Sequence, residues 1–520
     1  MNCQSGDPLA EKQVTALSKE KVLDALGEAA SKLRTELGES LATVQKFDVP
    51  LEQATTPSLE ALKAYSLGSK AYERGAAASL PYDQRAIELD PNFALGYRAV
   101  GIDYGNLGEE GRANEYFTKA FQLREHASEM ERLEIAAEYY MGVTGEMDKA
   151  AKTYQEEIET YPRDENLGAR GNLGLLYAAQ GHYEKAIAMT KEGVRLRPDG
   201  ESYAFLAGLA LASQRFDEAR QAIHEAQARE ADDQGLHGVL YALSFLAADS
   251  AAMAEQLKWF AGKPEYEDIG LGIASGTESY AGHLGKAREL TKRAADSAVR
   301  TDNKETGAGH LADAAVQEAA FGNTAQARQT AAEALKLAPA SRGVETEAAL
   351  ALAMNGETAR AEWLAQDLGK RFPLHSLTQS VWLPAIQAQL ALDRKDSAAA
   401  VAALQTATPI DLGTGDSCLY HVYVRGEAYL AAGQGSAAAA EFQKLLDHSG
   451  IVQNCWTGAL AHLGVARANA LQSRTSQGAD ADAARTRALA AYKDFLTLWK
   501  DADPDIPILK QAKAEYAMLQ

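Results

Sequence analysis

Apolar positions recur along the chain at the spacing of paired amphipathic helices. Residues 97–104 follow the spacing Tyr-x2-Val-Gly-x2-Tyr, and after a turn residues 113–120 follow Ala-x3-Phe-x2-Ala. Because residues three and four apart share one face of an α-helix, this stretch predicts a helix, a turn and a second helix. The same arrangement returns at residues 173–198 and 426–445.

The alanine of each second helix makes the period of this pattern visible. Most intervals between successive alanines are 33 to 40 residues, and one interval of 68 residues holds two periods. The alanines are Ala113, Ala150, Ala186, Ala219, Ala287, Ala327 and Ala361. A unit of about 34 residues built from two helices resembles the tetratricopeptide repeat, whose signature has these glycine, tyrosine and alanine positions.

A single helix pair cannot bury its own apolar face, so consecutive pairs must stack. We therefore expect an all-α protein, a right-handed α-solenoid of about 11–12 tetratricopeptide-like helix pairs that begins near Thr56. A degenerate unit near residues 236–264 predicts a weak link between an N-terminal repeat block, residues 56–265, and a C-terminal repeat block, residues 266–520. Inside the last unit, the polar residues 472–484 predict a mobile loop.

The first 55 residues lack the repeat pattern. Residues 9–16 predict a strand, and Ser18 is a candidate N-cap for a helix that runs to about Leu37. Residues 47–57 contain Pro50 and Pro57 and predict a linker. We therefore expect residues 1–55 to form a short α/β remnant followed by the linker.

Two segments resemble a particular protein family. Residues 21–68 resemble the junction before the repeats in bacterial eukaryotic-like serine/threonine protein kinases, and residues 499–520 resemble their C-terminal end. The resemblance implies that this chain corresponds to the tetratricopeptide-repeat region that follows the kinase domain. It does not imply kinase activity, because the domain that carries the activity is missing from this sequence.

Composition narrows the classes of function. The 520 residues include 72 acidic and 52 basic side chains, giving a net charge of −20, so we expect no nucleic-acid partner. No apolar stretch reaches the roughly 20 residues that a membrane span needs, so we expect no direct membrane insertion. The three cysteines, Cys3, Cys418 and Cys455, exclude a disulfide scaffold and fit a reducing cytoplasm. The alternative location is the extracytoplasmic part of a membrane-anchored kinase.

Catalytic motifs do not occur in the sequence. It has no HRD, DFG or APE motif, and the glycines at residues 270–276 do not follow the spacing of a phosphate-binding loop. His310 and Asp313 lie three residues apart and could touch, but an ordinary solvated ion pair is the simpler interpretation of these two residues. We expect no enzyme activity, no cofactor and no metal.

The function that the sequence favours is a protein–protein interaction scaffold. Stacked helix pairs form an extended concave surface lined by the first helices, which takes a peptide or protein partner. Trp382, Tyr420, Tyr423 and Arg425 are the candidate binding residues on that surface, because Trp, Tyr and Arg are enriched at binding hot spots. Burial of these rings in the core is the competing interpretation. The alternative function is the regulatory or docking region of a bacterial serine/threonine protein kinase.

A carboxylate-binding mode is a further alternative. Some tetratricopeptide repeats hold a peptide carboxylate with Lys and Asn side chains on successive first helices. Here only Arg98, Arg132 and Asn172 occupy comparable places. Ordinary solvated side chains are the simpler interpretation of these three residues.

Overall fold

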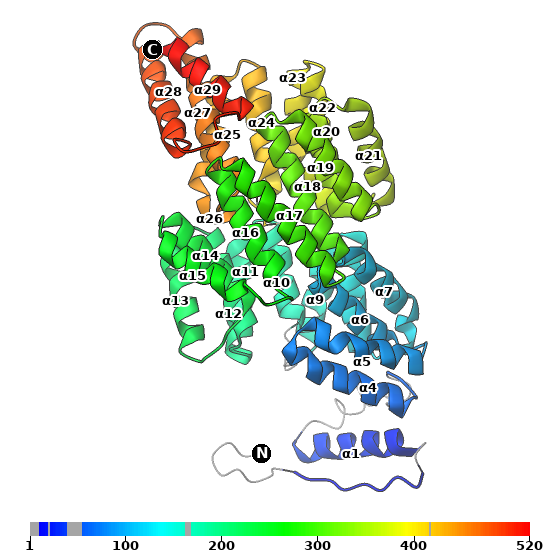
Figure 1. The fold of residues 1–520 in the computed structure, drawn as a ribbon. Helices are drawn as coiled ribbons and strands as arrows, with labels where there is room; N and C mark the ends of the chain where they lie inside the picture. Colours follow the sequence, from blue (N-terminus) through cyan, green and yellow to red (C-terminus); the bar gives the residue numbers. More distant parts are fainter. Residues whose placement is uncertain (1–9, 19–20, 39–54, 162–167, 415–417) are drawn as a thin grey trace. The chain divides into compact units, whose positions relative to one another are not determined.

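The computed structural model describes residues 10–18, 21–38, 55–161, 168–414 and 418–520. Within these ranges the chain forms 27 α-helices and no strand, so the all-α prediction is confirmed (Figure 1). Read two by two, α4 to α25 and then α27 and α28 form twelve helix pairs in the described residues. The prediction of about 11–12 stacked pairs is therefore confirmed.

Contacts divide the chain into two compact units. Unit 1 comprises Met1–Thr144 and Asp148–Pro162, and unit 2 comprises Gly145–Met147 and Arg163–Gln520. The boundary between repeat blocks expected near residue 265 stays a prediction. The weak link predicted there concerns local stability and stays a prediction.

Unit 1 contains three helix pairs and one helix before them. The helices are α1 (Val22–Glu36), α4 (Leu59–Ala71), α5 (Ala76–Leu89), α6 (Ala94–Asn106), α7 (Glu110–Leu123), α8 (Glu129–Glu138) and α9 (Met147–Thr160). A π-helical turn, Tyr139–Thr144, extends α8.

Unit 2 contains the remaining nine pairs and two further helices. Its first half holds α10 (Gly168–Ala179), α11 (Tyr183–Leu196), α12 (Gly200–Ala212), α13 (Phe216–Gln227), α14 (Gln234–Leu246), α15 (Ser250–Phe260), α16 (Glu267–Tyr280), α17 (Leu284–Arg300), α18 (Lys304–Ala320) and α19 (Thr324–Leu337). Its second half holds α20 (Arg342–Met354), α21 (Thr358–Arg371), α22 (Leu383–Asp393), α23 (Ser397–Ala403), α24 (Tyr420–Ala431), α25 (Gly435–Asp447), α26 (Ser449–Val452), α27 (Trp456–Thr475), α28 (Gly478–Leu498) and α29 (Pro507–Leu519).

Turns between paired helices use a left-handed backbone position, as the glycine pattern predicts. Gly181, Gly322 and Gly433 have φ of 75°, 85° and 74° at the turn after a first helix. In other units a non-glycine residue takes the same place, for example Gln214 with φ of 61° and Lys395 with φ of 61°. The turn geometry thus persists where the glycine signature has been lost.

Two local expectations need correction, and a third lies mostly outside the described residues. The described residues 10–16 contain no strand, so the predicted α/β remnant is wrong, although α1 confirms the helix after Ser18. The predicted loop at residues 472–484 is helical except for Ser476 and Gln477, because α27 and α28 continue through it. The linker predicted at residues 47–57 lies mostly outside the described residues.

Glycines on first helices allow large side chains to pack from second helices. Phe442 of α25 is fully buried between Gly426 of α24 and Gly464 of α27. A Cβ atom on Gly426 would lie 2.7 Å from the Phe442 ring, and one on Gly464 would overlap it. Three helices therefore meet at the Phe442 ring. A larger residue at either glycine position would clash with this ring.

We predict that Gly464→Ala lowers the free energy of unfolding by about 1–3 kcal/mol, because the methyl group overpacks against Phe442. Gly238 on α14 is the control, because a Cβ atom there meets nothing within 4 Å. Gly238→Ala should be neutral or should stabilise by up to about 1 kcal/mol. Equal effects of the two substitutions in urea denaturation would contradict this explanation.

Unit 1 contains a buried pair of carboxyl groups. Asp83 of α5 and Asp103 of α6 are both buried, and Ser79 donates a hydrogen bond to Asp103. Burial, reinforced by the charge of Asp103, raises the pKa of Asp83 from 3.8 to about 8. Burial also raises the pKa of Asp103 to about 6, although hydrogen bonds from Ser79 and Asp83 oppose this shift. The folded unit therefore holds protons that the unfolded chain releases.

We predict that unit 1 loses stability as the pH rises from about 4 to about 8. A carboxyl group whose pKa is raised by folding binds more protons in the folded state, so deprotonation favours unfolding. Asp83→Asn should remove more than about 1 kcal/mol of the stability difference between pH 5 and pH 8. Glu115→Gln, at an exposed position on α7, is the control. Hydrogen exchange of α5 and α6 measures the effect, and an unchanged pH profile in Asp83→Asn would refute it.

Candidate functional site

The four candidate binding residues lie together, but in the core of unit 2. Trp382 ends a π-helical turn before α22, and Tyr420, Tyr423 and Arg425 lie on the first turns of α24. Their exposed fractions are 9%, 2%, 5% and 2%. The expectation that these side chains are exposed on a binding groove is therefore wrong. Binding of a ligand by any of these four residues stays a prediction.

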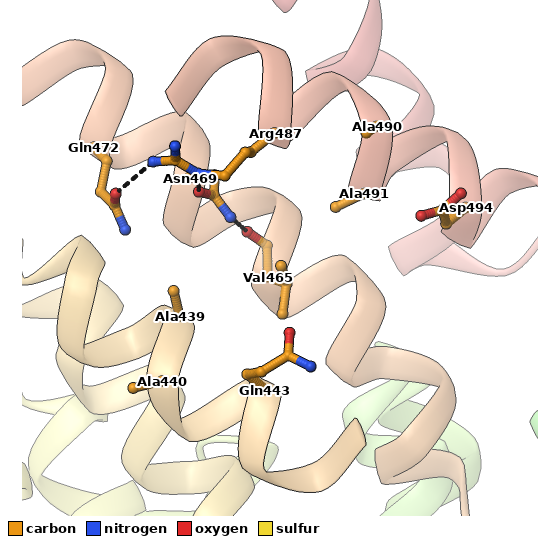
Figure 2. A pocket seen from close by; sticks show the side chains of 10 residues that line it. All are labelled: Ala439, Ala440, Gln443, Val465, Asn469, Gln472, Arg487, Ala490, Ala491 and Asp494. Carbon is orange, nitrogen blue, oxygen red and sulfur yellow. Dashed lines mark hydrogen bonds between the residues drawn. The ribbon is translucent and has the colours of Figure 1, made fainter. Parts of the chain in front are cut away.

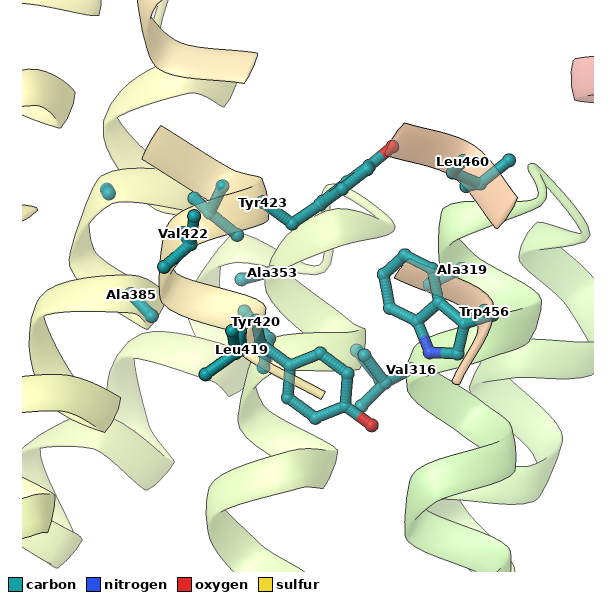
Figure 3. Packing of buried hydrophobic residues seen from close by; sticks show 14 of the residues in the cluster. Val316, Ala319, Ala353, Ala385, Leu419, Tyr420, Val422, Tyr423, Trp456 and Leu460 are labelled. Atoms are coloured by element: carbon teal, nitrogen blue, oxygen red, sulfur yellow. The ribbon is translucent and has the colours of Figure 1, made fainter. Parts of the chain in front are cut away.

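Trp456, the first residue of α27, packs against two of these side chains. Its ring stacks on Tyr420, with ring centroids 5.6 Å apart, and meets Tyr423 edge-on at 5.1 Å (Figure 3). Trp382 packs edge-on against Tyr420, and Phe321 lies edge-on to Trp456. Aromatic pairs in such geometries stabilise a core beyond the area they bury. Sequence reasoning missed Trp456, although it stands one repeat after Tyr420.

The helices under this aromatic cluster are α16 and α18. Val316 and Ala319 of α18 are buried in the same core as Trp456 (Figure 3). The Tyr420 hydroxyl donates to the carboxylate of Asp313 on α18 at 2.5 Å. The Asn454 amide, just before α27, donates to the Ile273 carbonyl of α16 at 2.9 Å. The first turns of α24 and α27 thus cover one side of two earlier first helices.

Arg425 belongs to a buried ion cluster. Its guanidinium donates to Asp411 at 3.0 and 2.5 Å and to Glu441 at 2.7 Å. Lys444 donates to Asp411 at 2.8 Å. Burial alone would raise the pKa of Asp411, but hydrogen bonds and charge from Arg425 and Lys444 hold it below its ordinary value. Arg425 is therefore fully engaged within the protein and fixes the chain before α24.

A disulfide joins Cys418 to Cys455, with Cα atoms 5.6 Å apart. The sequence argument excluded a disulfide scaffold and overlooked this single pair. The two cysteines are 37 residues apart, about one repeat; Cys418 lies two residues before α24, and Cys455 directly precedes α27. Residues at equivalent places in neighbouring repeats lie side by side, and that signal could have revealed the pair.

Other candidate groups from the sequence have structural partners. His310 pairs with Asp268 at 3.3 Å and not with Asp313. The glycines at 270 and 272 lie within α16, where a Cβ atom would press on the side chains of Phe260 and His310, respectively. These glycines allow close packing between helices. They do not form a phosphate-binding loop.

Arg98, the first candidate of the carboxylate-binding mode, is not available for a peptide. It is largely buried and pairs with Glu138 at 2.7 Å and with Glu134 at 3.4 Å. Both carboxylates come from α8, the next first helix of unit 1. Two carboxylates of the protein itself thus pair with the guanidinium that a peptide carboxylate would need.

Two open grooves lie on unit 2. One, of about 500 Å³, has walls of small residues on α25 and α28 and a floor on α27 (Figure 2). Arg487 donates to Asn469 at 2.8 Å along this floor. The other, of about 510 Å³, lies at the starts of α11 and α13 and is lined by His182, Arg215 and His448 among others.

The described part of the chain holds no group of three or more His, Cys, Asp or Glu side chains placed to bind a metal ion. Within the same residues, no helix combines the length and the hydropathy that a membrane crossing requires.

No family model and no curated protein matches the chain. Among solved structures, PilW, a widely conserved type IV pilus biogenesis factor, is 17% identical with a TM-score of 0.30, and the match covers 40% of this chain and 94% of PilW. Pseudomonas aeruginosa pilF is also 17% identical with a TM-score of 0.28, covering 40% of this chain and 96% of that protein. Likeness at this level carries no argument about function.

We predict that Tyr423→Ala lowers the free energy of unfolding by about 3–5 kcal/mol, because it leaves a cavity beside Trp456 and Phe442. Trp363 on α21 is the control, since 63% of its surface is exposed. Trp363→Ala should change stability by less than about 0.5 kcal/mol. Thermal and urea denaturation of both variants measure the effect, and a neutral Tyr423→Ala would show that the ring is not in the core.

Proposed function

We propose that the chain is a protein–protein interaction scaffold that binds a peptide or protein partner. The observation that supports this proposal is the stacking of consecutive helix pairs, in which each pair covers the apolar face of the next. The remaining helix faces form long surfaces whose side chains can vary without loss of the fold. Such surfaces are suited to recognition of another chain.

The finer proposal is that the partner binds the inner side of the first helices, where the concave surface is expected. On α16 and α18 this side is occupied by the first turns of α24 and α27. A partner that binds there has to replace Tyr420, Trp456 and Asn454. Binding at this place is therefore coupled to an opening of unit 2.

The alternative is a docking region that acts with a bacterial serine/threonine protein kinase. The resemblance of residues 21–68 and 499–520 to such proteins supports it. The Cys418–Cys455 disulfide favours an oxidising compartment over the cytoplasm expected from the scarcity of cysteine. We therefore propose the extracytoplasmic location. Thiol trapping of the protein in its native cells tests this, and fully reduced cysteines would contradict it.

Selection from a displayed peptide library tests the scaffold function. We predict enrichment of peptides that bind the folded chain with micromolar affinity or better and lose binding when the chain is unfolded in urea. Trp363→Ala serves as a variant that leaves the core intact. Failure to enrich any folding-dependent peptide, from the oxidised and from the reduced chain, would contradict the proposal.

A further inference from the structure

The disulfide connects the two segments that lie over α16 and α18. We call these segments, residues 418–423 and 454–458, the cover. Thr457 at the start of α27 also donates to the Cys418 carbonyl at 2.7 Å. The two parts of the cover, distant by one repeat in sequence, are thus held together by a disulfide, a hydrogen bond and the contacts of the Trp456 ring with Tyr420 and Tyr423.

The cover contacts α16 and α18 through side chains that a separate peptide could also supply. Three of these contacts are hydrogen bonds. The Tyr420 hydroxyl donates to Asp313, and the Asn454 amide donates to the Ile273 carbonyl and to the Thr277 hydroxyl, both at 2.9 Å. A further contact is the Trp456 ring, which packs in the same core as residues of α18. An aromatic ring beside a hydrogen-bond donor is a common form of peptide recognition.

The core around Trp456 leaves one polar atom of the cover unsatisfied. The Nε1 atom of Trp456 is buried and has no hydrogen-bond partner. A buried donor without an acceptor costs roughly 1–3 kcal/mol in general. The contact of Trp456 with this surface is therefore less favourable in free energy than a contact in which every buried donor has an acceptor. The disulfide can hold the Trp456 ring in place despite this cost, because it restricts the other conformations that the first turn of α27 could adopt.

We propose that the Cys418–Cys455 disulfide locks the cover over α16 and α18, and that its reduction exposes a binding surface for a peptide with an aromatic residue beside a hydrogen-bond donor. The peptide ligand in this proposal rests on the proposed scaffold function, whereas the disulfide lock does not. In the oxidised chain the cover occupies the surface and excludes the peptide. In the reduced chain the cover detaches in a fraction of molecules, and the peptide binds that fraction.

The reductant is a dithiol. One of its thiolates attacks a disulfide sulfur and releases a cysteine thiolate, and the second thiolate resolves the mixed disulfide. The protein gains two electrons and two protons, and the dithiol becomes a disulfide. Cys418 and Cys455 are both partly exposed, so a reductant can reach them without unfolding of the core.

Hydrogen exchange of the full chain tests the lock without any partner. Three samples are compared: the oxidised chain, the chain reduced with a dithiol, and a double variant, Cys418→Ser with Cys455→Ser. We expect exchange in α16 and α18 to rise about tenfold or more in the second and third samples, because these helices lose their cover. Helices α5 and α6 of unit 1 should not change. Cys3→Ser, which keeps the disulfide, is the matched control and should behave as the oxidised chain.

Two results would overturn the lock. One is unchanged exchange in α16 and α18 although alkylation shows that the disulfide is reduced. The other is an equal rise over all helices of unit 2, which would mean that the disulfide only adds general stability. Binding is a separate readout: a library peptide that prefers the reduced chain by about tenfold supports the ligand assignment. If exchange rises but no peptide binds either form, the scaffold function fails while the lock stands.

Discussion

The packing of Trp456 against α18 and α24 is the contact on which the second half of unit 2 depends. Its ring contacts Tyr420 and Tyr423 of α24 and Phe321 at the end of α18, so it joins two different helix pairs. An aromatic side chain buries about 150–250 Å², far more than the alanines that dominate the surrounding helices. These rings therefore supply much of the apolar contact that alanine-rich helices cannot make alone.

Charged groups supplement this core at the same place. Arg425, Asp411, Glu441 and Lys444 form a closed set of ion pairs beside the aromatic cluster. Removing one member of such a buried set leaves an uncompensated charge, which costs about 3–5 kcal/mol. We infer that the set fixes where the chain before α24 is placed, because apolar packing between small side chains has little directional preference. The disulfide then joins this fixed segment to α27.

The repeat architecture could be predicted from the sequence because its signals are local. A glycine at Gly426, a tyrosine three residues later and an alanine at Ala438 report the spacing within one helix pair. Tyr420 and Tyr423 are three residues apart on α24, and this local spacing puts them on one face of the helix. Their burial could not be predicted, because it depends on contacts with α18 and α27, which lie far away in sequence. The expected loop at residues 472–484 is wrong for a different, local reason: alanine and arginine favour a helix there, although their polar neighbours are typical of a loop.

A double-mutant cycle between Tyr420 and Asp313 tests most directly whether α24 lies on α18. Tyr420→Phe, Asp313→Asn and the double variant are compared by urea denaturation of the oxidised chain. The hydrogen bond between the two side chains predicts a coupling energy of about 1–3 kcal/mol. A coupling energy near zero would mean that the two side chains do not meet in solution, and the account of a covered inner surface would then be wrong.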